Sequence, residues 1–222
     1  MKPVPLVFLP GMMCDARLYA HQIDALSRKY PTQIGPVTNN DSFRDIAREV
    51  LEYAPSRFVL IGLSMGGIVA MEILAQAADR VCGAVLLDTS PFAEPEEGKA
   101  VRDQQIELVR SGYLEQLIVE QVIPMFDLEG DSGERIADTF LSMALDLGEE
   151  VFIRQSRALQ DRPDQQETLK TVAVPTLILC GRNDRLCPPE RHQLMHELIG
   201  GSEFKIIEGA GHLPTLERPE AT

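Results

Sequence analysis

The stretch Phe58-Val59-Leu60-Ile61-Gly62-Leu63-Ser64-Met65-Gly66-Gly67 decides the fold. Its first four residues are apolar and predict a buried strand, and the apolar spacing over residues 68–74 predicts a helix that follows at once. A serine at this junction lies on a sharp turn, for which the glycines two residues before and after it leave room. The pattern predicts a nucleophile elbow with an exposed Ser64 hydroxyl, although a glycine-rich turn with a capping serine would match it too.

Composition limits the kinds of partner. The chain has 222 residues, of which 44% are hydrophobic and 25% charged, so we expect one compact domain with an insertion. A formal net charge of -13 provides no basic surface for nucleic acid or an anionic membrane, and no segment is apolar for long enough to span a bilayer. The apolar run from Pro3 to Leu9 is too short for a signal peptide, is interrupted by Pro5 and lacks a small-residue cleavage site. Together with the cysteine pattern described next, this leads us to expect a cytoplasmic protein.

Four cysteines occur without a C-x-x-C pair or a zinc-like histidine spacing: Cys14, Cys82, Cys180 and Cys187. This distribution indicates reduced thiols, with neither a metal site nor a redox pair. Cys187 lies close to Asp184 in the sequence, but Pro188 and Pro189 follow it and no group nearby would lower its pKa, so we interpret it as a packing residue.

Apolar runs predict five further strands, at residues 4–9, 33–37, 81–87, 174–180 and 204–207, with the second at an edge. Runs that are apolar throughout are typical of strands buried on both faces of a parallel sheet. Helical spacing separates the runs, with Asp15 as an expected N-cap and a helix over residues 41–53. The sequence therefore predicts an α/β fold with about six mainly parallel strands and helices on both faces.

Strand signals stop between residues 92 and 165, where helical spacing predicts an inserted cap on a core of residues 1–91 and 166–222. This cap carries 17 acidic residues and 7 Lys or Arg, a formal charge of about -10. Two apolar stripes are expected on it, the first at Leu114, Leu117, Ile118 and Val122 and the second at Ile136, Phe140, Met143, Ala144 and Leu147.

Polar residues follow several of the predicted strands, at the sheet edge where α/β proteins bind ligands. Ser64 needs a base, and His212 is the histidine that directly follows a strand. Asp184, at the end of the neighbouring strand, is the expected acid that orients the imidazole. Asp88 is an alternative acid, although the turn sequence after it also fits a cap.

At these positions the chain resembles the bacterial α/β-hydrolases over essentially its whole length. The matching stretches are Leu9-Pro10-Gly11-Met12-Met13, the Ser64 elbow, Gly181-Arg182-Asn183-Asp184, Gly211-His212-Leu213 and Glu217-Arg218-Pro219. The resemblance implies an α/β-hydrolase fold, the triad Ser64, Asp184 and His212, and an oxyanion hole formed by the backbone N–H groups of Met12 and Met65. Pro10 replaces a histidine common among relatives, and their leading hairpin of strands is absent.

The combined pattern favours a serine carboxylesterase that needs no cofactor or metal and acts on small esters through an acyl-enzyme on Ser64. Met13 and Leu213 are expected to contact the substrate, and the acidic cap favours neutral esters over anionic ones. An inward-turned arginine among Arg102, Arg110, Arg154 and Arg157 would reverse that preference. Hydrolysis of lactones, thioesters, amides or C–C bonds, and a binding protein without catalysis, remain alternatives.

Two minor expectations concern helices near the C-terminus. His192 and His196 are four residues apart on a predicted helix, and we interpret them as a solvated face rather than a metal site. Glu217-Arg218-Pro219-Glu220 has the signature of a helix start just before the sequence ends. A missing helix there predicts exposed apolar surface and either a homodimer or lowered stability.

Overall fold

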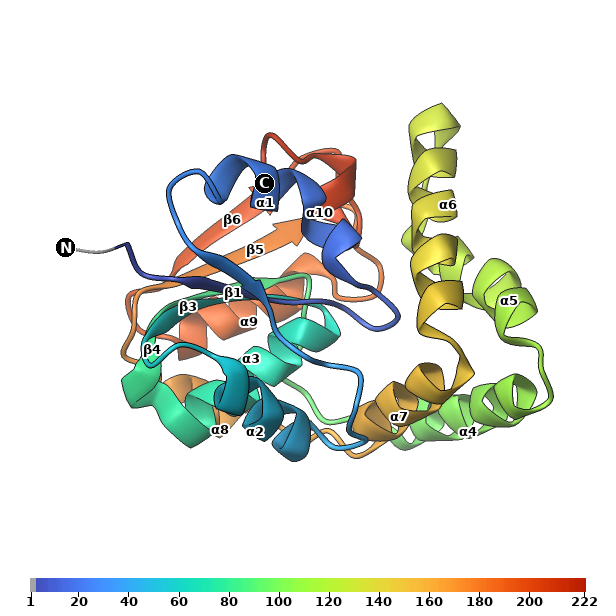
Figure 1. Ribbon diagram of the computed structural model, residues 1–222, viewed down its shortest axis with the longest axis horizontal. Coiled ribbons are helices and arrows are strands. Elements are labelled where there is room, and N and C mark those ends of the chain that lie inside the picture. The colour runs from blue at the N-terminus through green and yellow to red at the C-terminus, as the bar shows by residue number, and fades with distance from the viewer. Residues whose placement is uncertain (1–2) are drawn as a thin grey trace.

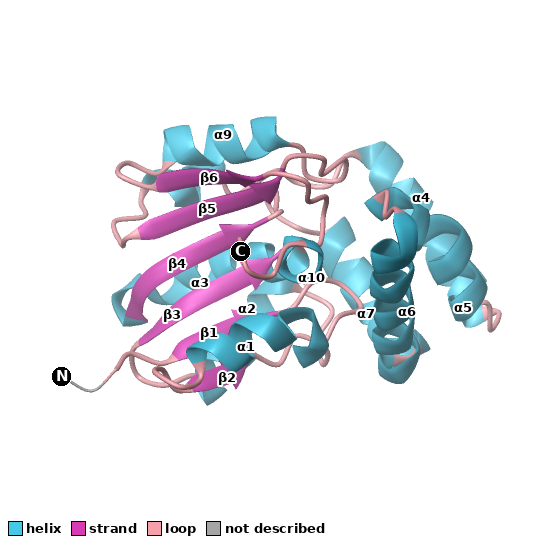
Figure 2. Cartoon of the chain, turned by 90° about the horizontal axis from the view of Figure 1, so that it is seen from above, coloured by secondary structure: helices cyan, strands magenta, loops and turns pink. Residues whose placement is uncertain are grey.

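The computed structural model describes residues 3–222 and contains one six-stranded parallel sheet. Figure 2 shows the strands side by side, in the order β2 (Thr32–Ile34), β1 (Leu6–Leu9), β3 (Phe58–Leu63), β4 (Val81–Leu87), β5 (Thr176–Gly181) and β6 (Glu203–Ile207). The predicted fold class is confirmed. Each strand lies within two residues of its predicted start, because a run of apolar residues bounded by turn residues has little freedom of register.

Helices cover both faces of the sheet (Figure 1). One face carries α1 (Ala20–Leu26), preceded by the short helix η1 (Ala16–Tyr19), and α10 (Pro214–Glu217). The other carries α2 (Phe43–Tyr53), α3 (Met65–Ala77), the short η2 (Ala78–Arg80), α8 (Gln166–Lys170) and α9 (Pro189–Leu198). Side-chain caps begin two of these segments, since Asp15 accepts from the Arg17 N–H and Ser42 from the Asp45 N–H, as N-cap residues do.

The segment between β4 and β5 forms a helical cap beyond the carboxyl ends of the strands (Figure 1). It consists of α4 (Glu96–Arg110), α5 (Leu114–Leu117), η3 (Ile118–Val122), η4 (Ile123–Phe126), α6 (Gly130–Leu147) and α7 (Glu149–Gln160). Most residues of both apolar stripes are buried in one cluster with side chains from the loops at the strand ends, while Val122 and Leu147 are half-buried. The cap is thus packed directly over the edge of the sheet where the polar residues gather.

The expected helix start at residues 217–220 is wrong. Pro214 opens α10 instead, and Glu217 is its last residue, with a carboxylate that accepts the N–H groups of Gly211 and Leu213 at 2.8 Å each. Pro at the first helical position and the demand of these two amides explain the earlier start. Of the eight large apolar side chains that are exposed in the described part of the chain, none follows Leu145 in the sequence.

No helix within residues 3–222 combines the length and the apolar character that a membrane span requires.

Candidate active site

Ser64 lies between β3 and α3 with φ 55° and ψ -117°, a conformation that non-glycine residues rarely adopt. Its N–H donates to the Leu87 carbonyl at 2.9 Å, which ties the turn to the neighbouring strand β4. A Cβ atom on Gly62 would collide with the Gly66 backbone, and one on Gly66 would collide with the Leu9 carbonyl. The turn is therefore the strained elbow expected from the sequence, and both glycines are sterically required.

The parallel register of the strands brings together Ser64, Asp184 and His212, which come from distant parts of the chain. Leu9, Gly62 and Leu86 are level across β1, β3 and β4, and β5 and β6 end beside them. His212, from the loop after β6, accepts the Ser64 hydroxyl at Nε2 over 3.0 Å. Its Nδ1–H donates to Asp184 Oδ2 at 2.9 Å, so the geometry has the serine–histidine–acid order in which the imidazole can take the serine proton.

Asp184 is held as a carboxylate by several donors. It is 3% exposed, and its second oxygen accepts the N–H groups of Leu186 and Cys187 at 2.8 and 2.9 Å. Burial alone would raise the pKa of Asp184, but the hydrogen bond and charge of His212 and the Cys187 N–H lower it below its ordinary value. The acid is thus ionised at neutral pH and fixes the proton on His212 Nδ1.

Asp88, the alternative acid, faces a different set of groups. It is fully buried with φ 41°, and its Oδ1 accepts the Gly181 N–H at 2.8 Å. Burial and then the negative charge of Asp184 raise the pKa of Asp88 well above its ordinary value. The imidazole nitrogen is bonded to Asp184 and not to Asp88.

Two backbone N–H groups remain free to bind a developing oxyanion. Met65 is the first residue of α3, where an N–H has no acceptor inside its own helix, and within residues 3–222 no other group accepts from it or from the Met12 N–H. The Met12 loop is a turn closed by the Cys14 N–H on the Gly11 carbonyl at 3.2 Å. These are the two donors that the sequence resemblance implied.

Gln155, on cap helix α7, contacts this loop and was not among the residues expected from the sequence. Gln155 is fully buried; its Oε1 accepts the Met13 N–H at 2.9 Å and its Nε2 donates to the Val37 carbonyl at 3.0 Å. Met13 has φ 55°, and the amide of Gln155 holds it there. The available signal is a polar residue within an apolar helical stripe formed by Val151, Phe152, Ala158 and Leu159.

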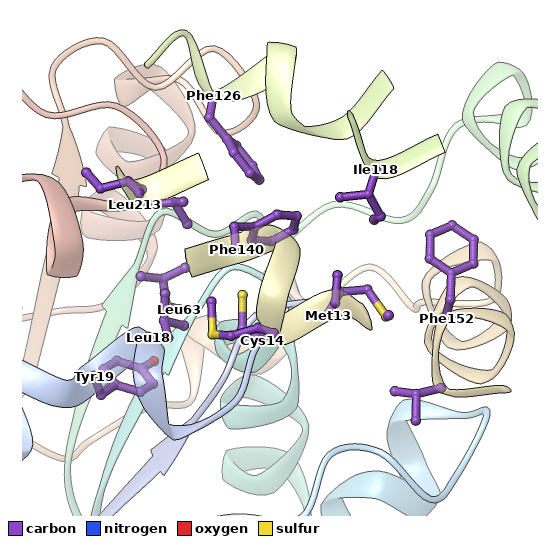
Figure 3. Packing of buried hydrophobic residues seen from close by; sticks show 14 of the residues in the cluster. Met13, Cys14, Leu18, Tyr19, Leu63, Ile118, Phe126, Phe140, Phe152 and Leu213 are labelled. Atoms are coloured by element: carbon purple, nitrogen blue, oxygen red, sulfur yellow. The ribbon is translucent and has the colours of Figure 1, made fainter. Parts of the chain in front are cut away.

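Apolar side chains from the cap and from the loops at the strand ends pack together, among them Met13, Phe126, Phe140 and Leu213 (Figure 3). The ring of Phe126 stacks on the imidazole of His212 with centroids 5.8 Å apart, and Phe140 meets Phe126 edge-on at 4.9 Å. Met13 and Leu213, the expected substrate contacts, are each 1% exposed and lie in the same apolar cluster. A hollow of about 360 Å³ opens beside the His212 loop between Phe126, Gly211 and Arg218.

Of the four arginines considered as inward-turned from the sequence, Arg102 does turn inward. Its Nη1 lies 3.8 Å from the Met12 sulfur, while its Nε donates to Glu94 Oε1 at 3.2 Å. Arg162, at the exit of the cap, contacts the other Glu94 oxygen at 2.7 Å. All three side chains are at least four-fifths buried, and Arg102 and Arg162 share the single Glu94 carboxylate, so the cluster keeps a formal charge of +1.

One cluster of side chains within residues 3–222 has the composition and spacing of a possible metal site. Asp184, Cys187 and His212 place one donor atom each within 4.8 Å of one another. The imidazole and the carboxylate already bond to each other, and burial raises the pKa of the Cys187 thiol far above its ordinary value, which keeps it protonated. This arrangement does not fit a metal ion.

The predicted solvated face at His192 is wrong. His192 is fully buried on α9, where its Nε2 accepts the Thr89 N–H at 3.0 Å and its Nδ1 lies 3.3 Å from the Pro188 carbonyl. Burial lowers the pKa of His192 to about 4, so it is neutral. The helical spacing of two histidines does not report that a loop from β4 covers one of them.

A parallel sheet that ends in a serine elbow, an acid and a histidine, in this chain order, defines a serine hydrolase of the α/β type. The family model described as "Alpha/beta hydrolase family" matches residues 6–222, and the chain belongs to that family.

Similar curated proteins include the pimeloyl-[acyl-carrier protein] methyl ester esterase of Yersinia enterocolitica, which is 25% identical over 210 residues, 90% of this chain and 78% of that protein. The protein of the same name from Pectobacterium carotovorum is 28% identical over 189 residues, 81% of this chain and 72% of its own. A thermophilic esterase from Thermogutta terrifontis, solved with malate bound, is 27% identical with a TM-score of 0.87, covering 99% of this chain and 86% of that one.

Proposed function

We propose that this protein is a serine esterase that hydrolyses small neutral carboxylic esters through an acyl-enzyme on Ser64. The single observation that carries the proposal is the hydrogen-bonded series Ser64 Oγ, His212 Nε2 and Nδ1, and Asp184 Oδ2, at 3.0 and 2.9 Å. The similarity to several proteins named as esterases supports ester bonds over the lactone, thioester, amide and C–C alternatives.

In the proposed reaction, His212 takes the Ser64 proton as the oxygen attacks the ester carbonyl. The Met12 and Met65 N–H groups stabilise the tetrahedral oxyanion, and His212 then protonates the departing alcohol. Water, deprotonated by His212, attacks the acyl-enzyme and releases the carboxylic acid. Met13 and Leu213 are the proposed apolar contacts of the acyl group.

The neutral-ester preference rests on charge. The cap carries a formal charge of about -10, and Glu94 already pairs with the inward Arg102. An acid substituent would therefore approach against the field and would have to compete with Glu94 for Arg102 beside Met12. For the same reason we do not extend the carrier-protein substrate in the relatives' names to this chain, because an acidic carrier would be repelled.

We propose a cytoplasmic location, since all four cysteines are free thiols.

Labelling and turnover test the proposal together. A fluorophosphonate probe should label Ser64 alone, and Ser64→Ala should abolish labelling and lower kcat for p-nitrophenyl acetate by roughly 10⁴-fold or more. Ser156→Ala is the control, because Ser156 is buried and its hydroxyl has no partner within the described residues. Activity that survives in Ser64→Ala, or a wild type that neither labels nor turns over, would contradict the proposal and favour a binding protein.

A further inference from the structure

The orientation of the Met65 N–H depends on one peptide unit, the one that joins Ser64 to Met65. The Ser64 carbonyl and the Met65 N–H belong to the same plane, so whatever holds the carbonyl also aims the oxyanion donor. The ψ angle of Ser64, which sets the rotation of this plane, is -117° at a residue whose φ is 55°. Such a conformation is costly for serine and persists only where surrounding contacts hold it.

Thr89, in the loop after β4, supplies the closest of those contacts. Its hydroxyl donates to the Ser64 carbonyl at 2.7 Å, whereas the helix amides of Gly67 and Ile68 share the same oxygen at 2.9 and 3.3 Å. Thr89 is fully buried, and a Cβ atom on Gly67 would lie within 2.7 Å of its side chain, so the absence of a side chain there admits the threonine.

His192 in turn holds the backbone of Thr89. A backbone N–H can only donate, so the 3.0 Å contact makes His192 Nε2 the acceptor and places its ring proton on Nδ1, toward the Pro188 carbonyl. The contacts therefore run without a break from α9 through the β4 loop to the elbow.

We infer that Thr89 is a positioning residue for the oxyanion hole, which aims and polarises the Met65 N–H by hydrogen-bonding the Ser64 carbonyl, and that His192 fixes Thr89 for this role. A hydrogen bond to the carbonyl draws electron density through the peptide and makes its N–H a better donor. This inference rests on the proposed acyl transfer at Ser64 and adds a residue whose hydroxyl and N–H bond to the Ser64 carbonyl and to His192 rather than to the side chains of Ser64, Asp184 or His212.

Thr89→Val and Thr89→Ser test it as a pair. Valine keeps the shape and the backbone N–H but removes the hydroxyl, whereas serine keeps the hydroxyl. The value of kcat is calculated from the concentration of active sites, which titration with fluorophosphonate gives. On this basis Thr89→Val should lower kcat for p-nitrophenyl acetate about tenfold, a smaller decrease than removal of a whole oxyanion donor causes. The same substitution should weaken the binding of a trifluoromethyl ketone inhibitor by the same factor, because the hemiketal oxygen that this inhibitor forms on reaction with Ser64 occupies the oxyanion hole. The KM should change little, and Thr89→Ser should restore most of the loss.

A purely structural role predicts another pattern. If Thr89→Val lowers the melting temperature but keeps kcat and inhibitor affinity, or if Thr89→Ser loses as much activity as Thr89→Val, the inference is overturned. If Thr89→Val does not fold, Thr89→Cys replaces it in the test, because a thiol is a weak hydrogen-bond donor. A kcat for Thr89→Cys that lies below that of Thr89→Ser and above one-tenth of wild type supports the inference. A kcat equal to that of wild type overturns it. A wild type without turnover would refute the proposed function instead.

Discussion

Two buried aspartates at neighbouring strand ends have different hydrogen-bond partners, His212 for Asp184 and the Gly181 N–H for Asp88, and the difference predicts their mutational effects. Asp184→Asn should lower kcat by about 10³-fold or more, because an amide cannot hold the Nδ1 proton on His212 or stabilise the imidazolium. Asp88→Asn should stay within about tenfold of wild type, since Asp88 does not bond to the imidazole and an amide oxygen can still accept the Gly181 N–H. Steady-state kinetics of the two variants check this, and the reverse ranking would assign the acid to Asp88.

The buried His192 predicts how stability depends on pH. The imidazole has an ordinary pKa near 6.5 when the chain is unfolded, and its pKa in the folded protein is lowered to about 4. Below pH 6.5 the unfolded chain binds a proton that the folded protein does not, so this residue destabilises the fold progressively as pH falls from about 6.5 to 4. The full effect is on the order of 3 kcal/mol.

Comparison with His192→Gln isolates this contribution from those of other groups, including Asp88, whose raised pKa changes stability in the opposite direction over the same range. In urea unfolding at pH 7 and pH 5, the wild type should lose more stability than His192→Gln between the two pH values. Equal losses in both proteins would mean that His192 is protonated or solvated in the folded state.

At the scale of the elements, the strands and the triad order followed directly from the sequence. Apolar runs such as residues 81–87 leave no alternative to burial, and parallel strands necessarily bring their carboxyl ends, with Ser64 and His212, to one edge. What the sequence missed depends on contacts between elements. Gln155, on a helix of the cap, reaches the Met13 loop 142 residues earlier, and no periodicity within either segment encodes that pairing.

Helix ends were also hard to predict, because the preference of a residue for a capping position competes with the hydrogen bonds that it forms with other parts of the fold. Glu217 has the character of a first-turn acid, yet the two amides of the His212 loop claim its carboxylate and make it the end of α10. His192 shows the same limit: a polar residue on a helix is normally solvated, and only the packing of the Thr89 loop over α9 reverses that expectation.

The role of α7 in supporting the oxyanion loop makes Gln155 a useful probe. Gln155→Leu leaves the Met13 N–H and the Val37 carbonyl buried without partners, so it should destabilise the fold by about 1–3 kcal/mol and lower kcat as the Met12 turn loosens. Gln160→Leu, on the same helix, is the control, because Gln160 bonds only to other cap residues. Urea unfolding and steady-state kinetics on both variants test this; equal kcat values in the two variants would contradict the link.

At the scale of the whole molecule, the homodimer expected from the sequence stays a prediction, although its reason has changed. Five of the eight exposed large apolar side chains in the described region lie on the cap: Val101, Tyr113, Val119, Met125 and Leu145. A second copy is therefore expected to contact the cap rather than the C-terminus. Light scattering should detect a dimer that Val119→Ser with Tyr113→Ser weakens, and a monomer across the accessible concentration range would count against it.

Charge over the whole molecule decides the last prediction, the preference between neutral and acidic esters. A short neutral ester should have a higher kcat/KM than its ω-carboxylate analogue, because the acidic cap repels the anion and Glu94 occupies Arg102 and Arg162. The difference should shrink when salt rises from 0.02 to about 0.5 M, as screening predicts.

Glu94→Gln removes the carboxylate that Arg102 and Arg162 share and should improve turnover of the carboxylate analogue more than that of the neutral ester. Glu107→Gln, on the exposed face of α4, removes one acidic charge of the cap without freeing either buried arginine and should produce only the smaller, salt-sensitive gain. A wild type that prefers the carboxylate analogue would show that the substrate anion displaces Glu94 from the arginines.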